Sequence, residues 1–465
     1  MTADSPRLTP TLIVCAIAIE AGLLLVLAAE TPAQQVAYVL VGYLVAGAAF
    51  GGLLWRLRRD TRATCSPAEM AIVIGAAVVF RATLFGVAPA TSHDVYRYLW
   101  EGLVQQRGFD PYRLAPDSPP LRALAAEHEA LWERINHRDI PAIYPPTMQT
   151  LFRIQAAALG GTLLGWKCVL LLFDGLLAGV LALKLRRLRA PPVWLAGVLW
   201  CPLLLLECYE GGHLDLVGVA LLAAAVVAYE YAPAQPRGAI RGTKTLAVCL
   251  LSGMLLGLSI DVKYFWPAVV AVLLTLRTRP RRYGAALAAA ALLVAAAAWV
   301  PYRAGFVAAR DTARMFAEHW TFNDIIFEAL RMVPMARWGP MVIVMVALAA
   351  AAGLLGFRRR AAGVAVAAAS DGADAWTDVW LLSGTTLLLA PVAYPWYFLW
   401  IVPGLVCRPP LWLVTWVLAV PALHLVDLHY VRTGVWDPMP WLWWVVDVLP
   451  ALLLAGAWRR RLCRR

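Results

Sequence analysis

The chain is poor in charge and especially poor in lysine. Only 15% of its 465 residues are charged and 61% are hydrophobic, whereas about 25% of a soluble domain is charged. Four of its 41 basic residues are lysine, and it has two asparagines, Asn136 and Asn323. Because so few polar residues are available to cover a surface that faces water, the composition excludes an ordinary soluble protein and predicts a membrane protein.

Several motif classes are also missing. The eight cysteines show no C-x-x-C spacing, so neither a zinc site nor a disulfide framework is indicated. No Walker loop or Rossmann glycine pattern follows a predicted strand, so nucleotide chemistry has no visible site. The net charge of +12 comes from short clusters between apolar runs, and a nucleic-acid partner is therefore not expected. No metal site or cofactor is indicated, and the need for a divalent cation stays open.

Long apolar runs recur from Leu12 to Trp458, and many approach the ~20 residues that span a bilayer. They predict an all-α, polytopic transmembrane protein that forms a single integral membrane domain over residues 1–465. Gly47-x-x-x-Gly51 and Gly253-x-x-x-Gly257 predict close helix packing. About fourteen helices are expected, near residues 10–30, 34–55, 68–88, 166–184, 192–206, 213–232, 245–260, 264–276, 284–301, 338–357, 377–392, 396–407, 411–427 and 441–457.

Basic clusters between these runs predict the topology, because short loops rich in Lys and Arg stay in the cytoplasm. Both termini should be cytoplasmic, and residues 89–146 and 302–337 should form long outer loops, the first carrying short helices. Residues 147–163 should form an interfacial or half-inserted helix, because a further crossing would reverse the topology. The clusters are Arg56–Arg62, Lys184–Arg189, Arg237–Lys244, Arg277–Arg282, Arg358–Arg360 and Arg459–Arg465.

All seven histidines and both asparagines then fall at or near the outer face, so the working site should face away from the cytoplasm. In the first outer loop, helical spacing aligns Asp94, Arg97, Tyr98 and Glu101 along one side. A carboxylate held near a cation can take a proton from a hydroxyl group, and Asp94 is the predicted catalytic base. The alternative is that Thr91-x-x-Asp94 is a capping box at a helix start.

A second polar cluster, Glu207 to Asp215, joins two predicted helices at the outer face. Glu207 is the favoured functional residue because it precedes the turn. His213 and Asp215 lie two residues apart, but such pairs recur by chance and no third metal ligand is specified. The alternative is an ordinary helix–helix turn.

Lys263 lies in a short outer turn, against the trend of the other basic residues, and aromatic residues flank it. A compact ammonium there can bind a lipid-linked phosphate, although pairing with Asp261 or snorkelling to the interface are alternatives. Trp396 belongs to the aromatic run 394–400, which is typical of an interfacial anchoring belt, with sugar stacking as the other possibility.

Together these motifs resemble the bacterial polytopic mannosyltransferases of the GT-C superfamily, in particular the alpha-mannosyltransferase branch, which use polyprenyl-phosphate sugars. The matches keep the family order over about residues 80–405. The matching segments are His93–Gly102 with Asp110-Pro-Tyr112, Ile135-Asn136-His137, Ile143-Tyr144-Pro-Pro with Gln149, Glu207 with Gly212-His213 and Asp215, Lys263 near Pro267, Phe322-Asn323, and Pro395–Trp400.

The resemblance implies an inverting transfer of a sugar, most simply mannose, from a polyprenyl-phosphate carrier to a glycan or glycolipid hydroxyl. The reaction would take place at the outer face of a bacterial inner (plasma) membrane, with Asp94 as base and with Lys263 and Arg97 at the phosphate. The other residues expected to bind donor or acceptor are Tyr98, Glu101, Tyr144, Glu207, His213, Asp215, Asn323 and Trp396.

The sequence departs from the resemblance at Gly211 and Leu214, where relatives often carry asparagine, and at His93, where a second aspartate is common. Roles that need those side chains are in doubt. The alternative function is a transporter or flippase of lipid-linked sugars, which should show inverted repeats and ionisable residues near the midplane. No internal repeat is visible. A non-catalytic assembly protein would not explain why the polar clusters share one face.

Overall fold

The computed structural model describes residues 8–60, 64–232, 239–278, 280–357 and 371–463. It is 78% helical, and the only strand pairing among these residues is an isolated bridge between Phe322 and Val392. Nine of the helices described are long and apolar enough to cross a membrane, or ten if the bent pair Pro192–Leu199 and Pro202–Glu210 is one span. The all-α polytopic class is confirmed, and the remaining predicted crossings stay predictions.

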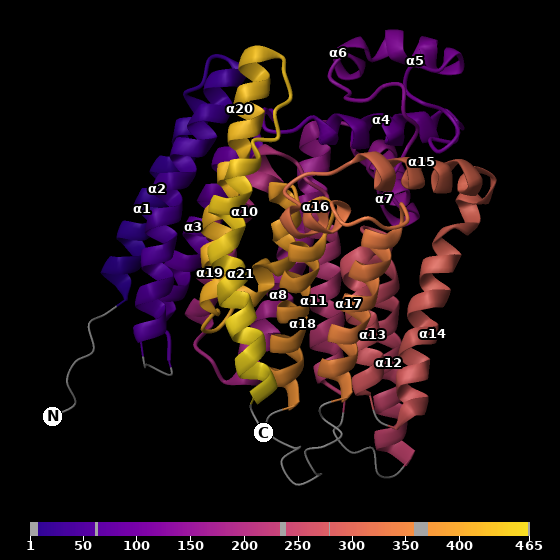
Figure 1. The fold of residues 1–465 in the computed structure, drawn as a ribbon. Helices are drawn as coiled ribbons and strands as arrows, with labels where there is room; N and C mark the ends of the chain where they lie inside the picture. Colours follow the sequence, from indigo (N-terminus) through magenta and orange to yellow (C-terminus); the bar gives the residue numbers. More distant parts are fainter. Residues whose placement is uncertain (1–7, 61–63, 233–238, 279, 358–370, 464–465) are drawn as a thin grey trace, which may run out of the picture. The chain divides into compact units, whose positions relative to one another are not determined.

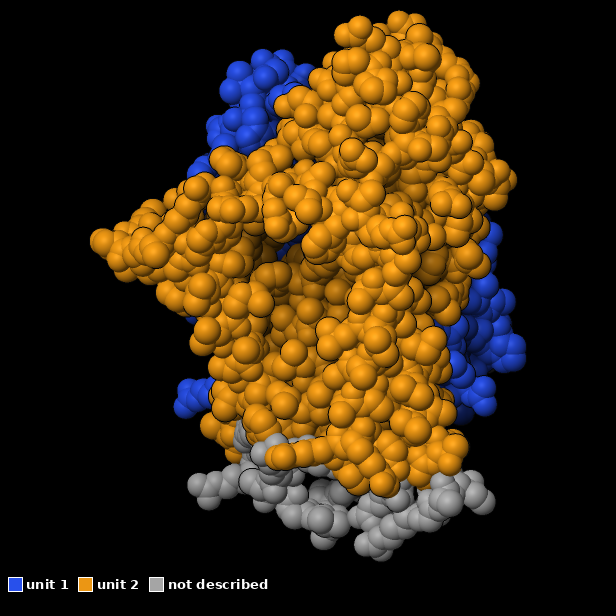
Figure 2. All heavy atoms as spheres, turned by 90° about the vertical axis from the view of Figure 1, so that its right-hand side faces the viewer, with its two compact units in different colours: residues 1–92, 178–213, 394–460 blue, residues 93–177, 214–393, 461–465 orange. Residues whose placement is uncertain are grey.

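The chain forms two compact units. Unit 1 comprises residues 1–92, 178–213 and 394–460, and unit 2 comprises residues 93–177, 214–393 and 461–465 (Figure 2). The long helix α8 (Leu163–Leu188) contributes to both. The other helices of unit 1 are α1 (Thr9–Leu27), α2 (Pro32–Arg59), α3 (Pro67–Phe85), η2 (Pro192–Leu195), α9 (Ala196–Leu199), α10 (Pro202–Leu205), η3 (Leu206–Glu210), η7 (Pro395–Leu405), α19 (Leu411–Ala419), η8 (Val420–Leu423), α20 (His424–Thr433) and α21 (Pro440–Cys463).

Proline positions explain most of the irregular backbone in unit 1. The predicted helix 192–206 is bent by 51° at a break that Pro202 follows, because proline lacks the N–H that would continue the ladder. The prediction of an α-helix over 396–407 is wrong. That stretch is the buried 3₁₀-helix η7, which starts at Pro395 and contains Pro403. Residues 206–210 form one turn of π-helix, a geometry frequent at functional sites.

Unit 2 combines membrane-length helices with short segments that gather at one end of its bundle (Figure 1). The long or apolar helices, besides α8, are α11 (Asp215–Glu230), α12 (Ala239–Ile260), α13 (Phe265–Arg277), α14 (Arg281–Ala298), α17 (Gly339–Phe357) and α18 (Asp371–Leu389). The short segments are α4 (Asp94–Gln106), η1 (Pro119–Leu121), α5 (Arg122–Glu127), α6 (Glu129–Trp132), α7 (Pro146–Leu159), η4 (Val300–Gly305), α15 (Phe306–His319) and α16 (Ile325–Arg331).

The predicted close packing at the glycine pairs takes two forms. A Cβ added at Gly257 would lie 2.5 Å from the Ala291 carbonyl oxygen, so α12 and α14 approach through their backbones. At Gly47 and Gly51 an added Cβ would meet only side chains, among them that of Leu418. That pattern therefore does not mark a backbone contact.

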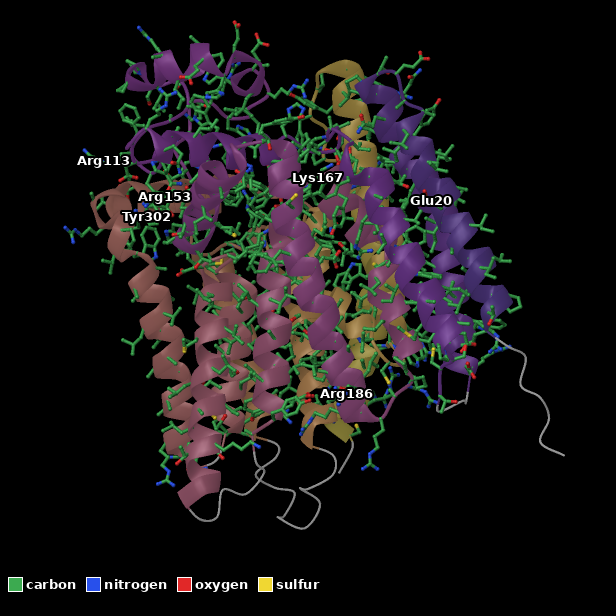
Figure 3. The ribbon with its side chains drawn as sticks, turned by 180° about the vertical axis from the view of Figure 1, so that it is seen from behind. Glu20, Arg113, Arg153, Lys167, Arg186 and Tyr302 are labelled. Atoms are coloured by element: carbon green, nitrogen blue, oxygen red, sulfur yellow. The ribbon has the colours of Figure 1, made fainter. Side chains whose placement is uncertain are left out.

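The two ends of the unit 2 bundle differ in structure. Helix α13 runs from the turn 261–264 to Arg277, and α14 starts back at Arg281, so these arginines lie at the end opposite that turn. Arg113, Arg153 and Tyr302 lie at the end that carries the short segments (Figure 3). Below those segments the face of unit 2 is hollowed (Figure 2).

Some predictions fall wholly or partly outside the described residues. The cluster Arg358–Arg360 does so, as do Arg62, Arg237, Arg464 and Arg465. Helix α7 has 14 residues, about 21 Å at 1.5 Å per residue, which is shorter than the bilayer core. Its placement as an interfacial or half-inserted helix stays a prediction.

Candidate active site

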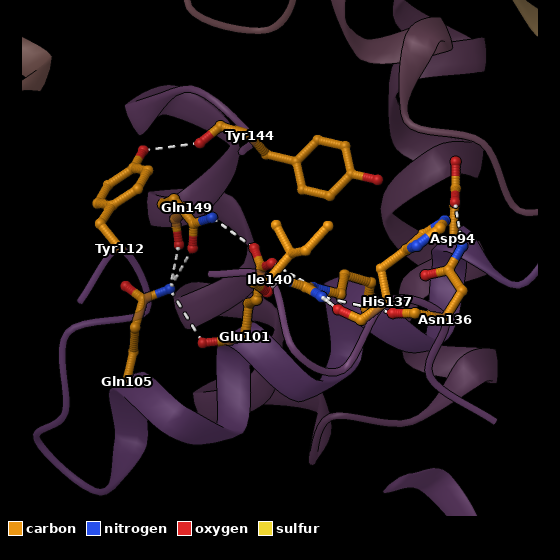
Figure 4. Close-up of polar contacts among 10 residues, drawn as sticks. Asp94, Glu101, Gln105, Tyr112, Asn136, His137, Ile140, Tyr144 and Gln149 are labelled. Atoms are coloured by element: carbon orange, nitrogen blue, oxygen red, sulfur yellow. Dashed lines mark hydrogen bonds and ion pairs between the residues drawn. The ribbon is translucent and has the colours of Figure 1, made fainter. Parts of the chain in front are cut away.

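Asp94 is the first residue of α4 and is held by a residue from farther along the segment 89–146. The Asn136 side-chain amide donates to Asp94 Oδ1 at 3.0 Å (Figure 4). The capping-box alternative is wrong, because His93 is the N-cap of α4 and Thr91 Oγ1 donates to Glu210 at 2.6 Å. Asp94 as a whole residue is half-buried, and the hydrogen bond from Asn136 positions its carboxyl.

The surroundings of Asp94 favour its action as a base. Burial raises the pKa of its carboxyl above the usual value, and the charge of Asp215 acts in the same direction. Donation from Asn136 and the charges of Lys263 and His137 oppose this increase but do not cancel it. A carboxylate with a raised pKa binds a proton more strongly than a solvent-exposed one, which suits a general base.

Lys263 forms the cationic part of the site. Its Nζ lies 2.7 Å from Asp215 Oδ1, with the Lys263 side chain a fifth exposed and Asp215 buried. Burial lowers the pKa of the lysine, while Asp215 and Asp94 raise it less strongly. The alternative pairing with Asp261 is wrong. Asp261 is buried, its Oδ2 has no hydrogen-bond partner, and burial raises its pKa to about 7.

Arg97 and Glu101 lie one helical turn apart on α4, as their spacing predicts. Arg97 Nε donates to Glu101 at 2.9 Å, and both side chains are buried. The guanidinium also donates to the backbone carbonyls of His137, at 2.8 Å, Asn136, at 3.4 Å, and Ile140 (Figure 4). Arg97 therefore ties α4 to the loop segment that supplies Asn136.

Glu101 continues this network toward α7 and η4. Its second oxygen accepts a hydrogen bond from Gln149 of α7, and Gln149 accepts one from Gln105 at 2.9 Å. Tyr302 Oη donates to Gln105 at 3.0 Å. The sequence resemblance included Gln149 but did not give it this role, and nothing in the local pattern pointed to Tyr302.

The two predicted tyrosines have different environments. Tyr98 is buried, stacked on Phe152 at 5.0 Å, with the edge of Tyr144 also 5.0 Å away. Tyr144 is half-buried, and its carbonyl accepts a hydrogen bond from Tyr112 at 2.7 Å. Tyr98 therefore belongs to the packed core between α4 and α7, whereas Tyr144 keeps accessible surface near the α4 site.

Asn323 follows Phe322, which forms an isolated bridge with Val392, just after the end of α18. Its φ of 52° is left-handed, and it is 4% exposed. Asn323 Oδ1 and Asp324 Oδ2 are buried without hydrogen-bond partners. Asp324, which the sequence analysis missed, has a pKa raised to about 6 by burial and by Glu328.

Glu207, His213 and Trp396 belong to unit 1, where His213 lies next to both of the others. Glu207 in the π-helical turn η3 accepts from His424 Nε2 at 2.8 Å and lies 3.7 Å from His213. The other nitrogen of His424 contacts Asp427 at 2.7 Å. The sequence analysis did not single out His424, because 217 residues separate it from Glu207.

The ring of Trp396 is stacked within the protein. His213 lies nearly parallel to it with ring centroids 3.9 Å apart, and Tyr394 does the same at 4.7 Å. A sugar would therefore meet the edge of Trp396 more readily than its faces. Among the residues that the structure describes, no group of three or more His, Cys, Asp or Glu side chains is placed to hold a metal ion.

Comparison with known proteins gives one match. Residues 11–310, more than half of the chain, match the MptA_B family, described as alpha-(1→6)-mannopyranosyltransferase, N-terminal domain. The matched region contains Asp94, Asn136, Asp215 and Lys263. No curated protein and no solved structure matches.

Proposed function

Because the chain belongs to the MptA_B family of alpha-(1→6)-mannopyranosyltransferases, we propose that this membrane mannosyltransferase takes mannose from a polyprenyl-phosphate carrier and transfers it to a glycan or glycolipid hydroxyl at the outer face. The observation that carries the proposal is that unit 2 brings a candidate base close to a candidate cation for the phosphate. The carboxylate of Asp94, a half-buried residue, lies within electrostatic reach of Lys263, whose side chain is a fifth exposed.

We propose a single inverting displacement. The acceptor hydroxyl attacks C1 of the mannose, Asp94 takes the hydroxyl proton, and the bond from C1 to the phosphate oxygen breaks. The electron pair leaves with the lipid phosphate, whose charge Lys263 stabilises. Asp215 holds the ammonium in place at 2.7 Å. No other group needs to donate a proton, because a phosphate monoester leaves as an anion.

The location of the reaction also forms part of the proposal. Arg277 and Arg281 lie at the bundle end opposite the turn that holds Lys263. Because basic loop residues favour the cytoplasmic side, this arrangement supports an active site at the outer face of the bacterial inner membrane. Nucleotide sugars are made in the cytoplasm, so a lipid-linked donor suits a site on that face.

The proposal is tested with the purified protein in lipid vesicles, supplied with labelled polyprenyl-phosphate mannose or labelled nucleotide mannose and with extracted envelope glycan as acceptor. We expect transfer from the lipid donor only, and a loss of at least about 100-fold in Asp94→Asn. The matched control is Asp117→Asn, an exposed aspartate of the same outer loop, which should retain wild-type transfer.

Each contrary result identifies the part that is wrong. Transfer from the nucleotide sugar would overturn the proposal that the donor is lipid-linked. Full activity of a folded Asp94→Asn variant would overturn the assignment of Asp94 as the base. Movement of the carrier between leaflets without transfer would favour the flippase alternative.

A further inference from the structure

The contacts of Arg97 differ from those expected of a phosphate ligand. Its guanidinium makes four hydrogen bonds within the protein, to Glu101 and to the carbonyls of Asn136, His137 and Ile140. Arginine has five N–H groups, so one is left. A bidentate grip on a phosphate needs two. The side chain is also 4% exposed, which leaves almost no surface for a ligand.

We propose that Arg97 is a positioning residue that clamps the loop segment 136–140 onto α4 and thereby fixes the Asn136 amide on Asp94. This inference rests on the proposed role of Asp94 as base. Glu101 supports the clamp, because it balances the buried charge of Arg97 and is itself held by Gln149. Neither residue of the ion pair contacts the substrates.

The backbone of the clamped segment supports this role. His137 has a φ of 47°, in the left-handed region, which a non-glycine residue adopts at a cost unless its surroundings hold it there. The Arg97 guanidinium binds the His137 carbonyl on one side of the segment, and the Asn136 side chain reaches Asp94 on the other. The segment has other contacts, since the Asp117 N–H donates to the Arg138 carbonyl at 3.1 Å and the rings of His137 and Trp320 lie 5.2 Å apart. Arg97, however, binds the carbonyls on both sides of this stretch, those of Asn136, His137 and Ile140.

The clamp should act on the protonation of Asp94. The groups that act on this carboxyl do so from four parts of the chain, and donation from Asn136 is the strongest of those that lower its pKa. Loss of that hydrogen bond therefore raises the pKa further, and a higher pH is then needed to generate the base. The groups are Asn136 and His137 of the loop, Lys263, Asp215, and Tyr98, Glu101 and Tyr144 around them.

The experiment compares the wild type with Arg97→Met, Asn136→Ala and the double variant, measuring kcat, KM for the lipid donor and the pH profile. We expect Arg97→Met to lower kcat by about 100-fold with KM for the donor little changed. The acidic limb of the profile should move up by about 0.5 to 1 pH unit. The double variant should be no worse than Arg97→Met alone, because both changes remove one interaction.

Hydrogen exchange of the unliganded protein tests the clamp without any assumption about the reaction. Peptides over residues 134–141 should exchange faster in Arg97→Met than in the wild type, while peptides over 261–265 should not change. The control is Arg107→Met, at the end of the same helix, which removes a surface pair with Glu127 and should alter none of these measurements.

If Arg97 bound the donor phosphate, the measurements would give the opposite result. In that case Arg97→Met would raise KM for the donor while the acidic limb and the exchange of 134–141 stayed unchanged, and the proposal would be overturned. If Arg97→Met does not fold, Asn136→Ala keeps the arginine contacts and must still show the shifted limb. If Asp94→Asn remains active, the proposed base fails, whereas the exchange result still decides whether the clamp exists.

Discussion

At the scale of single residues, the candidate groups of both units contact partners that are distant in the chain, as His424 contacts Glu207 and Lys263 contacts Asp215. Residue type and position led to Asp94 and Lys263 as candidate site residues, because polar groups at membrane level are costly without a role. The sequence did not identify their partners, since Asn136 and Asp215 lie 42 and 48 residues away. It likewise missed His424, a histidine within an apolar stretch.

The His424 cluster is predicted to stabilise the protein. Both ring nitrogens contact carboxylates, those of Glu207 and Asp427, so with both acids ionised the ring must donate twice and carry a positive charge. His424→Leu would leave the buried Glu207 without its partner, at a cost of about 3 kcal/mol. Thermal unfolding in detergent should show a clearly lower midpoint than for the wild type.

Two comparison variants make this result specific. Glu207→Gln keeps a hydrogen-bonding side chain next to His424 and should cost less than His424→Leu. Glu127→Gln weakens an exposed pair and should cost under about 1 kcal/mol. An unchanged midpoint in His424→Leu would contradict the structural role.

At the scale of helices, length and hydropathy located nearly every apolar element, because membrane-spanning segments must satisfy their backbone internally. The type of helix was less predictable. Residues 395–405 are helical, as hydropathy predicts, but they form a 3₁₀-helix and not an α-helix. Pro403 lies inside this helix and cannot donate a backbone hydrogen bond. The π-helical turn at 206–210 left no pattern in the sequence. Glycines at close backbone contacts were recognised only where a second glycine followed four residues later, as at Gly253 and Gly257. Gly102 has no such second glycine, so its contact with α7 was missed.

Helix α4 owes its position on α7 to Gly102. A Cβ added there would lie 2.5 Å from the Phe152 carbonyl oxygen and 3.0 Å from Ala156 Cβ. Because a backbone carbonyl cannot move aside, Gly102→Ala should destabilise the protein by about 1–3 kcal/mol and lower transfer activity by displacing Asp94. Thermal unfolding and the transfer assay measure the two effects.

Gly175→Ala is the matched change in a helix with open space. An added Cβ there meets nothing within 4 Å, so it should leave stability unchanged or raise it, since alanine is the better helix former. Equal effects of the two substitutions would show that the α4–α7 contact does not require glycine.

At the scale of the whole molecule, composition alone was sufficient for the class of protein, and the ordered motifs for the family. The division of the chain into two units was not predictable, because each unit is assembled from separate stretches. Hydropathy indicates whether a side chain prefers an apolar environment, whether lipid or protein. It does not indicate which residues pack against that side chain.

The proposed orientation predicts which positions can be labelled from outside the cell. A membrane-impermeant maleimide applied to intact cells should label Ala123→Cys, an exposed position in α5, but not Arg282→Cys, exposed at the start of α14. Permeabilised cells should label both. Cys65, Cys407 and Cys463 provide internal controls, because all three are predicted to face the cytoplasm. Labelling of Arg282→Cys in intact cells would reverse the proposed topology.

Three of the four groups that receive hydrogen bonds from Arg97 are main-chain carbonyls. A carbonyl is present whichever amino acid occupies a position, so residues 137 and 140 are free to vary in evolution while the arginine is not. Lysine is a poor replacement, because one ammonium cannot reproduce the planar fork. Homologous sequences should therefore show an invariant arginine whose acceptor positions drift, a dependence that analysis of covarying residues would not detect.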